Sequence, residues 1–393
     1  MVQLAADTAL HEAKQADEVL ARGDLTGPLH GLPFTVKDWI ETRGVVCTAG
    51  EERHRQYVSK HDATVVSRLR QAGGIFLGKT NVVNNPVYGR TNNPYNLEYT
   101  PADSSSGEAA IIAAGGSPLG LGSDSGGSIR QPAHNCGIAG LKPSTGRIPL
   151  TGHFPRINPL SDPRTAIGPM ARYVEDLALV LPIMGGMDWQ DASVIPMPLS
   201  DWREVDLKRL RVAFYTSHEH AKPTLETDET VRRAAQALTN LGLETEEALP
   251  ERVEEAYAIT RAYWQRPESE SWEKWAPDGE VTLSNEEVEQ HLFQWDRFRR
   301  CLIRFMARYD VVLTPVAEQP AVRHGEPEGG IPYTLPYSLT GYPCAVVRGG
   351  TSPEGLPIGV QVVARPWRDD VALAVAHLLE RALGGYQRPV LTP

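Results

Sequence analysis

The sequence predicts an α/β protein in which helices cover both faces of a large, mainly buried sheet. Segments with the pattern of buried strands alternate with helical segments along most of the chain. Glycine (35 residues) and proline (31 residues) are more frequent than in an average protein of this length, which indicates many turns and argues against a helical bundle. Because we find no internal repeat and no clean linker, we expect residues 1–393 to form a single domain.

Residues 1–116 contain two strand-like segments and three helical ones. Apolar residues at helical spacing near the N-terminus predict an amphipathic surface helix; they are Ala5, Ala9, Leu10, Ala13, Ala16, Val19 and Leu20. Residues 62–74 read as a helix with Asp62 as its cap and glycine as its stop, and IFLGKT follows as a strand. The remaining elements are a turn and strand over Leu29–Ile40 and a short buried helix over Glu108–Gly116.

The rest of the chain continues the alternation of strands and helices, except for one segment that differs in composition. We expect a helix over Ala171–Gly186, a strand–helix–strand unit between Leu210 and Pro250, the strands DVVLTP, CAVVRGG and PIGVQVVA, and a closing helix DDVALAVAHLLERALGG. Residues 251–309 are charged and aromatic, which favours a helical cap packed on the main body; alternatively, some of these aromatic side chains line a substrate pocket. They are Tyr257, Tyr263, Trp264, Trp272, Trp275, Phe293, Trp295 and Phe298.

Composition limits the classes of function. Apolar residues make up 41% and charged residues 22%, as in soluble globular proteins. A net charge of -10 without a long basic run argues against a nucleic-acid partner. The four cysteines are far apart and fit neither a metal site nor a disulfide framework, so we expect a reducing compartment. Without a signal peptide or an apolar run that could span a bilayer, we expect a cytoplasmic protein with no membrane partner.

Two motifs suggest ligands that their context does not support. Gly73 and the run Gly78-Lys79-Thr80 match the P-loop pattern, but a helix precedes them and Ile75, Phe76 and Leu77 occupy the place of the phosphate cradle. We therefore interpret this segment as a helix stop followed by a buried strand. His218 and His220 lie in a loop without metal-ligand spacing, so we assign no metal.

The segment from Ala102 to Arg147 carries the strongest functional signal. Between Ser104 and Ser128, 14 of 25 residues are glycine or serine, yet the segment also contains apolar runs that require burial, which a flexible linker would not. Glycines directly before Ser128 allow backbone amides to converge as an oxyanion hole beside its hydroxyl. We expect Asp124 and Arg130 to hold this turn through a charge-assisted hydrogen bond.

A serine nucleophile needs a base, and no histidine is an evident candidate. Lys37 ends the apolar run Leu32–Val36, and burial lowers the pKa of a lysine enough to keep part of it neutral. The alternative is an ordinary lysine at a strand edge, paired with Asp38. The sequence spacing alone does not decide between these two interpretations.

Taken together, these residues resemble the amidase signature family, the Ser–Ser–Lys hydrolases. The resemblance rests on HGLPFTVKDWI, on the stretch from SSSGEAAIIAAGG to GLKPSTGRI, on AIGPMARYVEDLALVL, and on the C-terminal DVVLTP, LTGYPCAVVRGG and GLPIGVQVVARPW. It implies a large central mixed sheet and the hydrolysis of a carboxamide, with esters or carbamates as further substrates, through an acyl-enzyme. Carried over residue by residue, it implies Ser128 as nucleophile, Ser104 after a cis peptide bond as proton relay, Lys37 as base, the amides of Ser125, Gly126, Gly127 and Ser128 as oxyanion hole, and Ser105 as a supporting residue.

The chain departs from the family pattern in two places. Asp103 stands beside the relay serine, where the family usually has glycine, and we expect it to raise the pKa of Lys37 or to contact substrate. Lys37 also lies closer to the N-terminus than the family pattern places it, so helices that normally precede it are missing. We therefore expect the surface of a homodimer, or part of the pocket, to differ from that of the family. We expect a small-molecule amide as the substrate and no cofactor. Two alternatives remain open: an amide-cleaving component of an amidotransferase complex, and a degenerate member that only binds.

Overall fold

The computed structural model describes residues 1–157, 163–264 and 283–390. Within these residues, eleven strands form one mixed sheet in the order β1-β3-β2-β4-β6-β5-β10-β11-β9-β7-β8. The strands are β1 (Gln3–Leu4), β2 (Pro33–Lys37), β3 (Ile75–Thr80), β4 (Leu119–Asp124), β5 (Ala139–Lys142), β6 (Ala166–Ala171), β7 (Arg211–Phe214), β8 (Glu244–Glu247), β9 (Val311–Pro315), β10 (Cys344–Thr351) and β11 (Pro357–Ala364).

Parallel pairing occurs at two places in the sheet, and antiparallel strands connect them. Strand β2 runs parallel to both β3 and β4, and β7 runs parallel to both β8 and β9. The central strands β6, β5, β10 and β11 pair antiparallel. Because β2 and β4 are parallel, their carboxyl ends, Lys37 and Asp124, lie at the same edge of the sheet.

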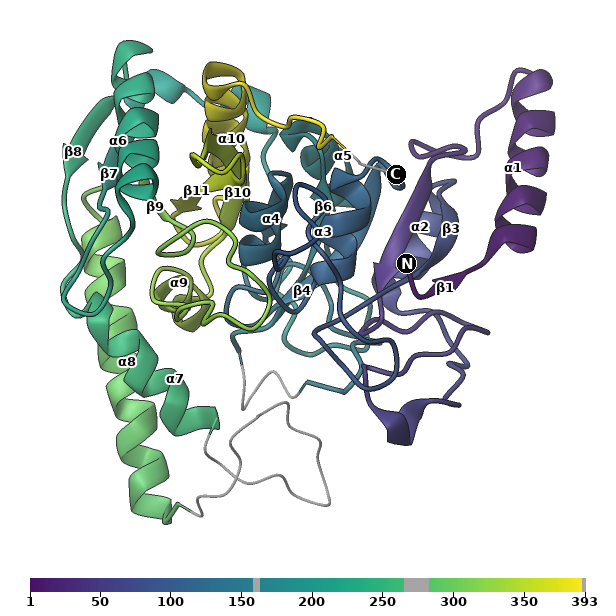
Figure 1. Ribbon diagram of the computed structural model, residues 1–393, viewed down its shortest axis with the longest axis horizontal. Helices are drawn as coiled ribbons and strands as arrows, with labels where there is room; N and C mark the ends of the chain where they lie inside the picture. The colour runs from purple at the N-terminus through teal and green to yellow at the C-terminus, as the bar shows by residue number, and fades with distance from the viewer. Residues whose placement is uncertain (158–162, 265–282, 391–393) are drawn as a thin grey trace.

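Helices pack on both faces of the sheet, as the sequence predicts (Figure 1). On one face α2 (Thr64–Gln71), α5 (Val174–Met184), α6 (Leu225–Asn240) and α10 (Asp369–Leu383) enclose the largest apolar core. The opposite face carries α3 (Ser106–Ala113) and α4 (Arg130–Cys136), and beside them α7 (Ala256–Trp264), α8 (Asn285–Met306) and α9 (Leu335–Thr340). In Figure 1, α1 (Ala6–Ala21) and α6 lie at opposite ends of the molecule.

Most predicted elements are present, with shorter bounds and one wrong cap. The cap of α2 is Ala63 and not Asp62, because the Asp62 carboxylate accepts a hydrogen bond from Arg43 N instead. Gly73 ends that helix with a φ of +94°. The N-terminal helix buries less of its apolar stripe than expected, since Leu10 is 62% exposed.

The aromatic segment is helical where the structure describes it. Trp295 is buried and its indole N–H donates to Leu339 O, while Phe298 lies in the apolar core under α8. Tyr257 and Phe293, in contrast, are exposed. The indole rings expected at Trp272 and Trp275 lie outside the described residues. Among the helices that are described, none combines the length and the apolar character that crossing a bilayer requires.

Candidate active site

Lys37 is held in the protein interior by the strand that it ends. Strand β2 is paired on both sides, so its last side chain is fully buried. The Lys37 amine lies 2.6 Å from Ser104 Oγ and 3.1 Å from both the carbonyl and the hydroxyl oxygen of Ser123. It also lies 4.3 Å from the centre of the Trp39 ring. Lys37 thus contacts the predicted relay serine directly, and it forms no ion pair with Asp38 among the described residues.

Burial decides the protonation of Lys37. Loss of water around the amine lowers its pKa from 10.5 to about 7, although the carboxylates of Asp124, Asp103 and Glu108 act in the opposite direction. The expected influence of Asp103 is therefore present but weaker than burial. Asp103 itself has its pKa raised to about 6, first by burial and then by the neighbouring Glu328. About half of the Lys37 amines are neutral near pH 7.

Ser104 and Ser105 form the turn that leads into α3. The peptide bond between Asp103 and Ser104 is cis, at the position where the resemblance places it. Ser105 N donates to Ser128 O at 3.1 Å, so the turn lies directly beside the loop that contains the predicted nucleophile. The close approach of α3 to β4 depends on glycine, because a Cβ at Gly120 would lie 1.9 Å from the Glu108 carboxylate.

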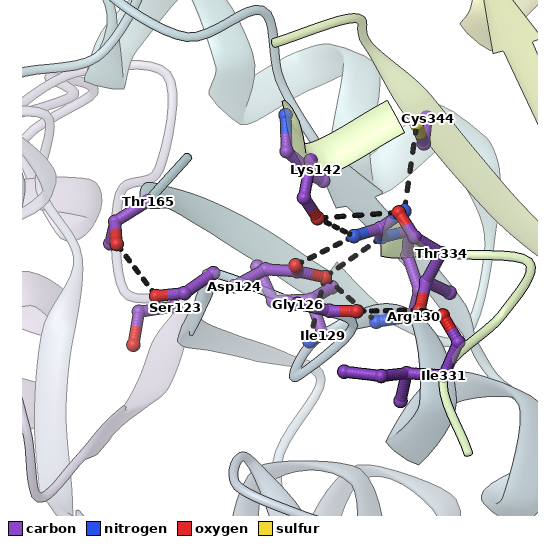
Figure 2. Close-up of polar contacts among 12 residues, drawn as sticks. Ser123, Asp124, Gly126, Ile129, Arg130, Lys142, Thr165, Ile331, Thr334 and Cys344 are labelled. Carbon is purple, nitrogen blue, oxygen red and sulfur yellow. Dashed lines mark hydrogen bonds and ion pairs between the residues drawn. The ribbon is translucent and has the colours of Figure 1, made fainter. Parts of the chain in front are cut away.

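The loop of residues 125–128, where the sequence predicts an oxyanion hole, has backbone amides that the described residues leave unused. Within the described part of the chain, the backbone N–H groups of Ser125, Gly126, Gly127 and Ser128 donate no hydrogen bond. Gly127 has a φ of +148°, and a Cβ there would lie 2.8 Å from Thr334 Oγ1. Thr334 in turn donates to Gly126 O at 2.5 Å (Figure 2). The loop is therefore fixed through its carbonyl oxygens, while its amides remain available for a ligand.

Asp124 and Arg130 form a bidentate ion pair beneath this loop (Figure 2). Both side chains are fully buried, and the Arg130 guanidinium also donates to Thr334 O, Gln361 Oε1 and Ser338 Oγ. Burial alone would raise the pKa of Asp124, but Arg130 and the backbone amide of Ile129 hold it below its usual value. The pair thus connects the end of β4 to α9 and β11.

The hydroxyls of Ser104 and Ser128 are not hydrogen-bonded to each other in the described residues. The structure therefore brings together Lys37 and Ser104, and it brings Ser128 to the same turn through the backbone. Ser128 is partly exposed whereas Lys37 is not. The site thus contains a partly exposed serine, a second serine in the adjoining turn, and a buried amine that contacts this second serine.

Several residues of the site carried no signal in the sequence analysis. Ser123 contacts the Lys37 amine, His153 contacts the hydroxyl of Ser123, and Thr334 donates to Gly126 O in the 125–128 loop. Glu108 accepts from Thr35 and Thr80 at 2.7 Å each, and burial raises its pKa to about 7. Ser123 could have been found from its place in the Ser123-Asp124-Ser125 run, but no local pattern marks His153.

The structure rejects the P-loop interpretation. Residues 75–80 form strand β3 after helix α2, and the side chain of Lys79 is buried and donates to Ile40 O. Among the described residues, no group of three or more potential ligands is arranged for a metal ion, and His218 and His220 are no exception. The four cysteines are free and buried.

Comparison with known proteins identifies the family. The family model described as Amidase matches residues 1–266 and 260–373. The A subunit of glutamyl-tRNA(Gln) amidotransferase from Moorella thermoacetica is 32% identical over 441 residues, covering 98% of this chain and 89% of the relative. The solved structure of the corresponding protein from Thermotoga maritima is 26% identical with a TM-score of 0.80, over 93% of this chain and 88% of that one.

A third similar protein is named as a hydrolase and not as an amidotransferase subunit. The structure of 6-aminohexanoate cyclic dimer hydrolase complexed with substrate is 26% identical with a TM-score of 0.82, and the match covers 99% of this chain and 91% of that chain. The mixed sheet, the lysine at the end of β2 and the serine-rich turn thus occur in a chain that belongs to the amidase signature family.

Proposed function

We propose that this protein cleaves a carboxamide C–N bond through an acyl-enzyme formed on Ser128. The observation that carries the proposal is the buried Lys37 amine, 2.6 Å from Ser104 Oγ, beside a loop whose four amides are unoccupied among the described residues. A pKa of about 7 lets this amine accept a proton near neutral pH without the help of a histidine.

In the proposed mechanism the proton moves inward as the new bond forms. Ser128 Oγ attacks the carbonyl carbon and passes its proton to Ser104 Oγ, while the proton of Ser104 passes to Lys37 Nζ. The amides of residues 125–128 stabilise the negative charge on the carbonyl oxygen. As the tetrahedral intermediate collapses, the C–N bond breaks, the leaving nitrogen takes a proton from Ser104 Oγ, and Ser104 takes one back from Lys37 Nζ. A water molecule then repeats these steps and releases the acid.

The nitrogen that is released has two possible destinations, and the relatives favour one of them. The Moorella thermoacetica relative described above is an A subunit of glutamyl-tRNA(Gln) amidotransferase, aligned over 98% of this chain. We therefore infer that the amide is that of glutamine and that the ammonia is delivered to a partner protein. A free-standing amidase acting on another amide is the second candidate, which the similarity to 6-aminohexanoate cyclic dimer hydrolase supports.

The first experiment measures the intact mass of the protein after treatment with a fluorophosphonate. We expect one adduct on the wild type and none on Ser128→Ala, because only an activated serine reacts readily. If neither protein forms an adduct, the proposed nucleophile is wrong. An adduct that persists on Ser128→Ala would place the reactive serine elsewhere.

Ammonia release then separates the two candidates. The purified chain is incubated with glutamine and, in parallel, with aliphatic and aryl amides, alone and with the proteins that co-purify with it. Glutamine turnover that rises when the co-purifying proteins are present supports the amidotransferase role. Turnover of other amides by the isolated chain, without any glutamine turnover, supports the free-standing amidase.

A further inference from the structure

Besides its contact with Ser104, the amine of Lys37 takes part in a second series of hydrogen bonds. Its amine lies 3.1 Å from Ser123 Oγ, and Ser123 Oγ lies 3.1 Å from Nε2 of His153. The other ring nitrogen of His153, Nδ1, lies 2.8 Å from Pro155 O. All three side chains are at least nine-tenths buried: Lys37 ends β2, Ser123 lies near the end of β4, and His153 comes from the loop between β5 and β6.

The chemistry of the three side chains determines which atom donates and which accepts in each of these hydrogen bonds. A backbone carbonyl only accepts, so His153 Nδ1 must carry a hydrogen and donate it to Pro155 O. In the neutral imidazole, Nε2 is then an acceptor, and the only donor that Ser123 can offer it is the hydroxyl hydrogen. The hydroxyl oxygen of Ser123 therefore presents lone pairs, and no hydrogen, to Lys37.

This direction determines where the lone pair of Lys37 points. A neutral amine has two hydrogens and one lone pair. The carbonyl oxygen of Ser123 takes one of the hydrogens, and the hydroxyl oxygen of Ser123, with its own hydrogen committed to His153, takes the other. The remaining neighbour is Ser104 Oγ at 2.6 Å, which is left to donate to the lone pair.

We propose that His153, acting through Ser123, is a positioning residue that directs the lone pair of Lys37 toward the hydroxyl of Ser104. The inference rests on the proposed function, in which Lys37 accepts the proton of Ser104. If His153 offers no acceptor, the Ser123 hydroxyl rotates and donates to Lys37. That contact competes with Ser104 for the lone pair and stabilises the neutral amine.

The test uses the rate at which a fluorophosphonate labels Ser128, followed from pH 5 to 10. His153→Leu removes the acceptor and His153→Gln retains one in its amide oxygen. The exposed His61 is the matched control, as His61→Leu. We expect His153→Leu to label about tenfold more slowly at its plateau, the rate equivalent of one hydrogen bond, with its half-maximum at lower pH than in the wild type. His153→Gln and His61→Leu should both label within about twofold of the wild type.

A double-substitution cycle separates this role from simple packing. In Ser123→Ala no hydroxyl is left to rotate, so adding His153→Leu to it should slow labelling no further. Additive losses in the double variant would overturn the proposal, as would a folded His153→Gln that labels as slowly as His153→Leu. The three carboxylates that act on Lys37, those of Asp103, Glu108 and Asp124, are unchanged in every variant, so the shift in pH belongs to the Ser123–His153 pair.

The outcome is distinguishable from a failure of the proposed function. A wild-type protein that is not labelled at all contradicts the nucleophile itself, whereas a labelled wild type whose His153→Leu variant shows the same rate and pH profile contradicts only the positioning role. Thermal unfolding of each variant is measured in parallel. If His153→Leu does not fold, the labelling rate of His153→Gln is measured both alone and in the Ser123→Ala background. A folded His153→Gln that labels about tenfold more slowly than the wild type would then overturn the proposal.

Discussion

Replacement of Lys37 by methionine should abolish the reactivity of Ser128 and yet stabilise the fold at neutral pH. The pKa of Lys37 is about 7 in the folded protein and 10.5 for an ordinary lysine. Between these values the unfolded chain binds more protons than the folded one, so the stability of the wild type rises with pH across this window. The cost to the wild type is about 4 kcal/mol at pH 7 and about 1 kcal/mol at pH 10.

The methionine variant escapes this cost but loses hydrogen bonds. Lys37 makes three, with Ser104 Oγ and with both oxygens of Ser123. At about 1 kcal/mol each, their loss offsets about 3 kcal/mol. The variant should therefore be more stable than the wild type by about 1 kcal/mol at pH 7 and less stable by about 2 kcal/mol at pH 10. The sign of the difference reverses because methionine does not titrate.

The assay is urea unfolding of both proteins at pH 7 and pH 10, with fluorophosphonate labelling at each pH. Lys60, which is exposed, provides the matched control as Lys60→Met, for which we expect the same stability as the wild type at both pH values. A difference between Lys37→Met and the wild type that stays constant from pH 7 to pH 10 would refute the reasoning, because it would mean that Lys37 is charged in the folded protein across that range.

Two further substitutions test the charges around the site. Arg130→Met should destabilise the protein by about 3–5 kcal/mol in urea unfolding, because it leaves the fully buried Asp124 carboxylate without its partner; adding Asp124→Asn should recover part of this loss, and a single variant as stable as the wild type would contradict the assignment. Asp103→Asn removes a carboxylate that raises the pKa of Lys37, so the half-maximum of Ser128 labelling should move to lower pH by up to about one unit. A move to higher pH would show that Asp103 acts on the substrate or on the turn instead.

The sequence alone predicts those features of the candidate site that depend on residues close together in the chain. The apolar run before Lys37 predicts a buried strand that ends in an amine, and the glycines before Ser128 predict a turn with free amides. The Asp124–Arg130 pair is also local, since only six positions separate the two residues. These features depend on strand periodicity and on the conformational freedom of glycine, which act over a few residues.

Local sequence pattern predicts less well the features that depend on how other segments pack against a helix. Aspartate is a common helix cap, so the sequence predicts Asp62 as the cap of α2, but its carboxylate accepts a hydrogen bond from the backbone N–H of Arg43. The leucines of the N-terminal helix follow a helical stripe, yet Leu10 is mostly exposed because little of the sheet extends beneath that helix. In the first place a partner from another segment decided the outcome, and in the second the position of the helix relative to the sheet did.

Only the tertiary structure decided how the predicted groups are connected. Ser104 is 67 residues from Lys37 and Ser123 is 86. The contact with Ser123 follows from the parallel register of β2 and β4, and the contact with Ser104 from the turn that precedes α3. His153 reaches Ser123 from a separate loop, without any pattern in its own neighbourhood. Hydrogen bonds have a reach of about 3 Å and a strict direction. Composition and spacing along the chain therefore determined which chemical groups this protein has, and the packing of distant segments determined which of them lie within hydrogen-bonding distance of each other.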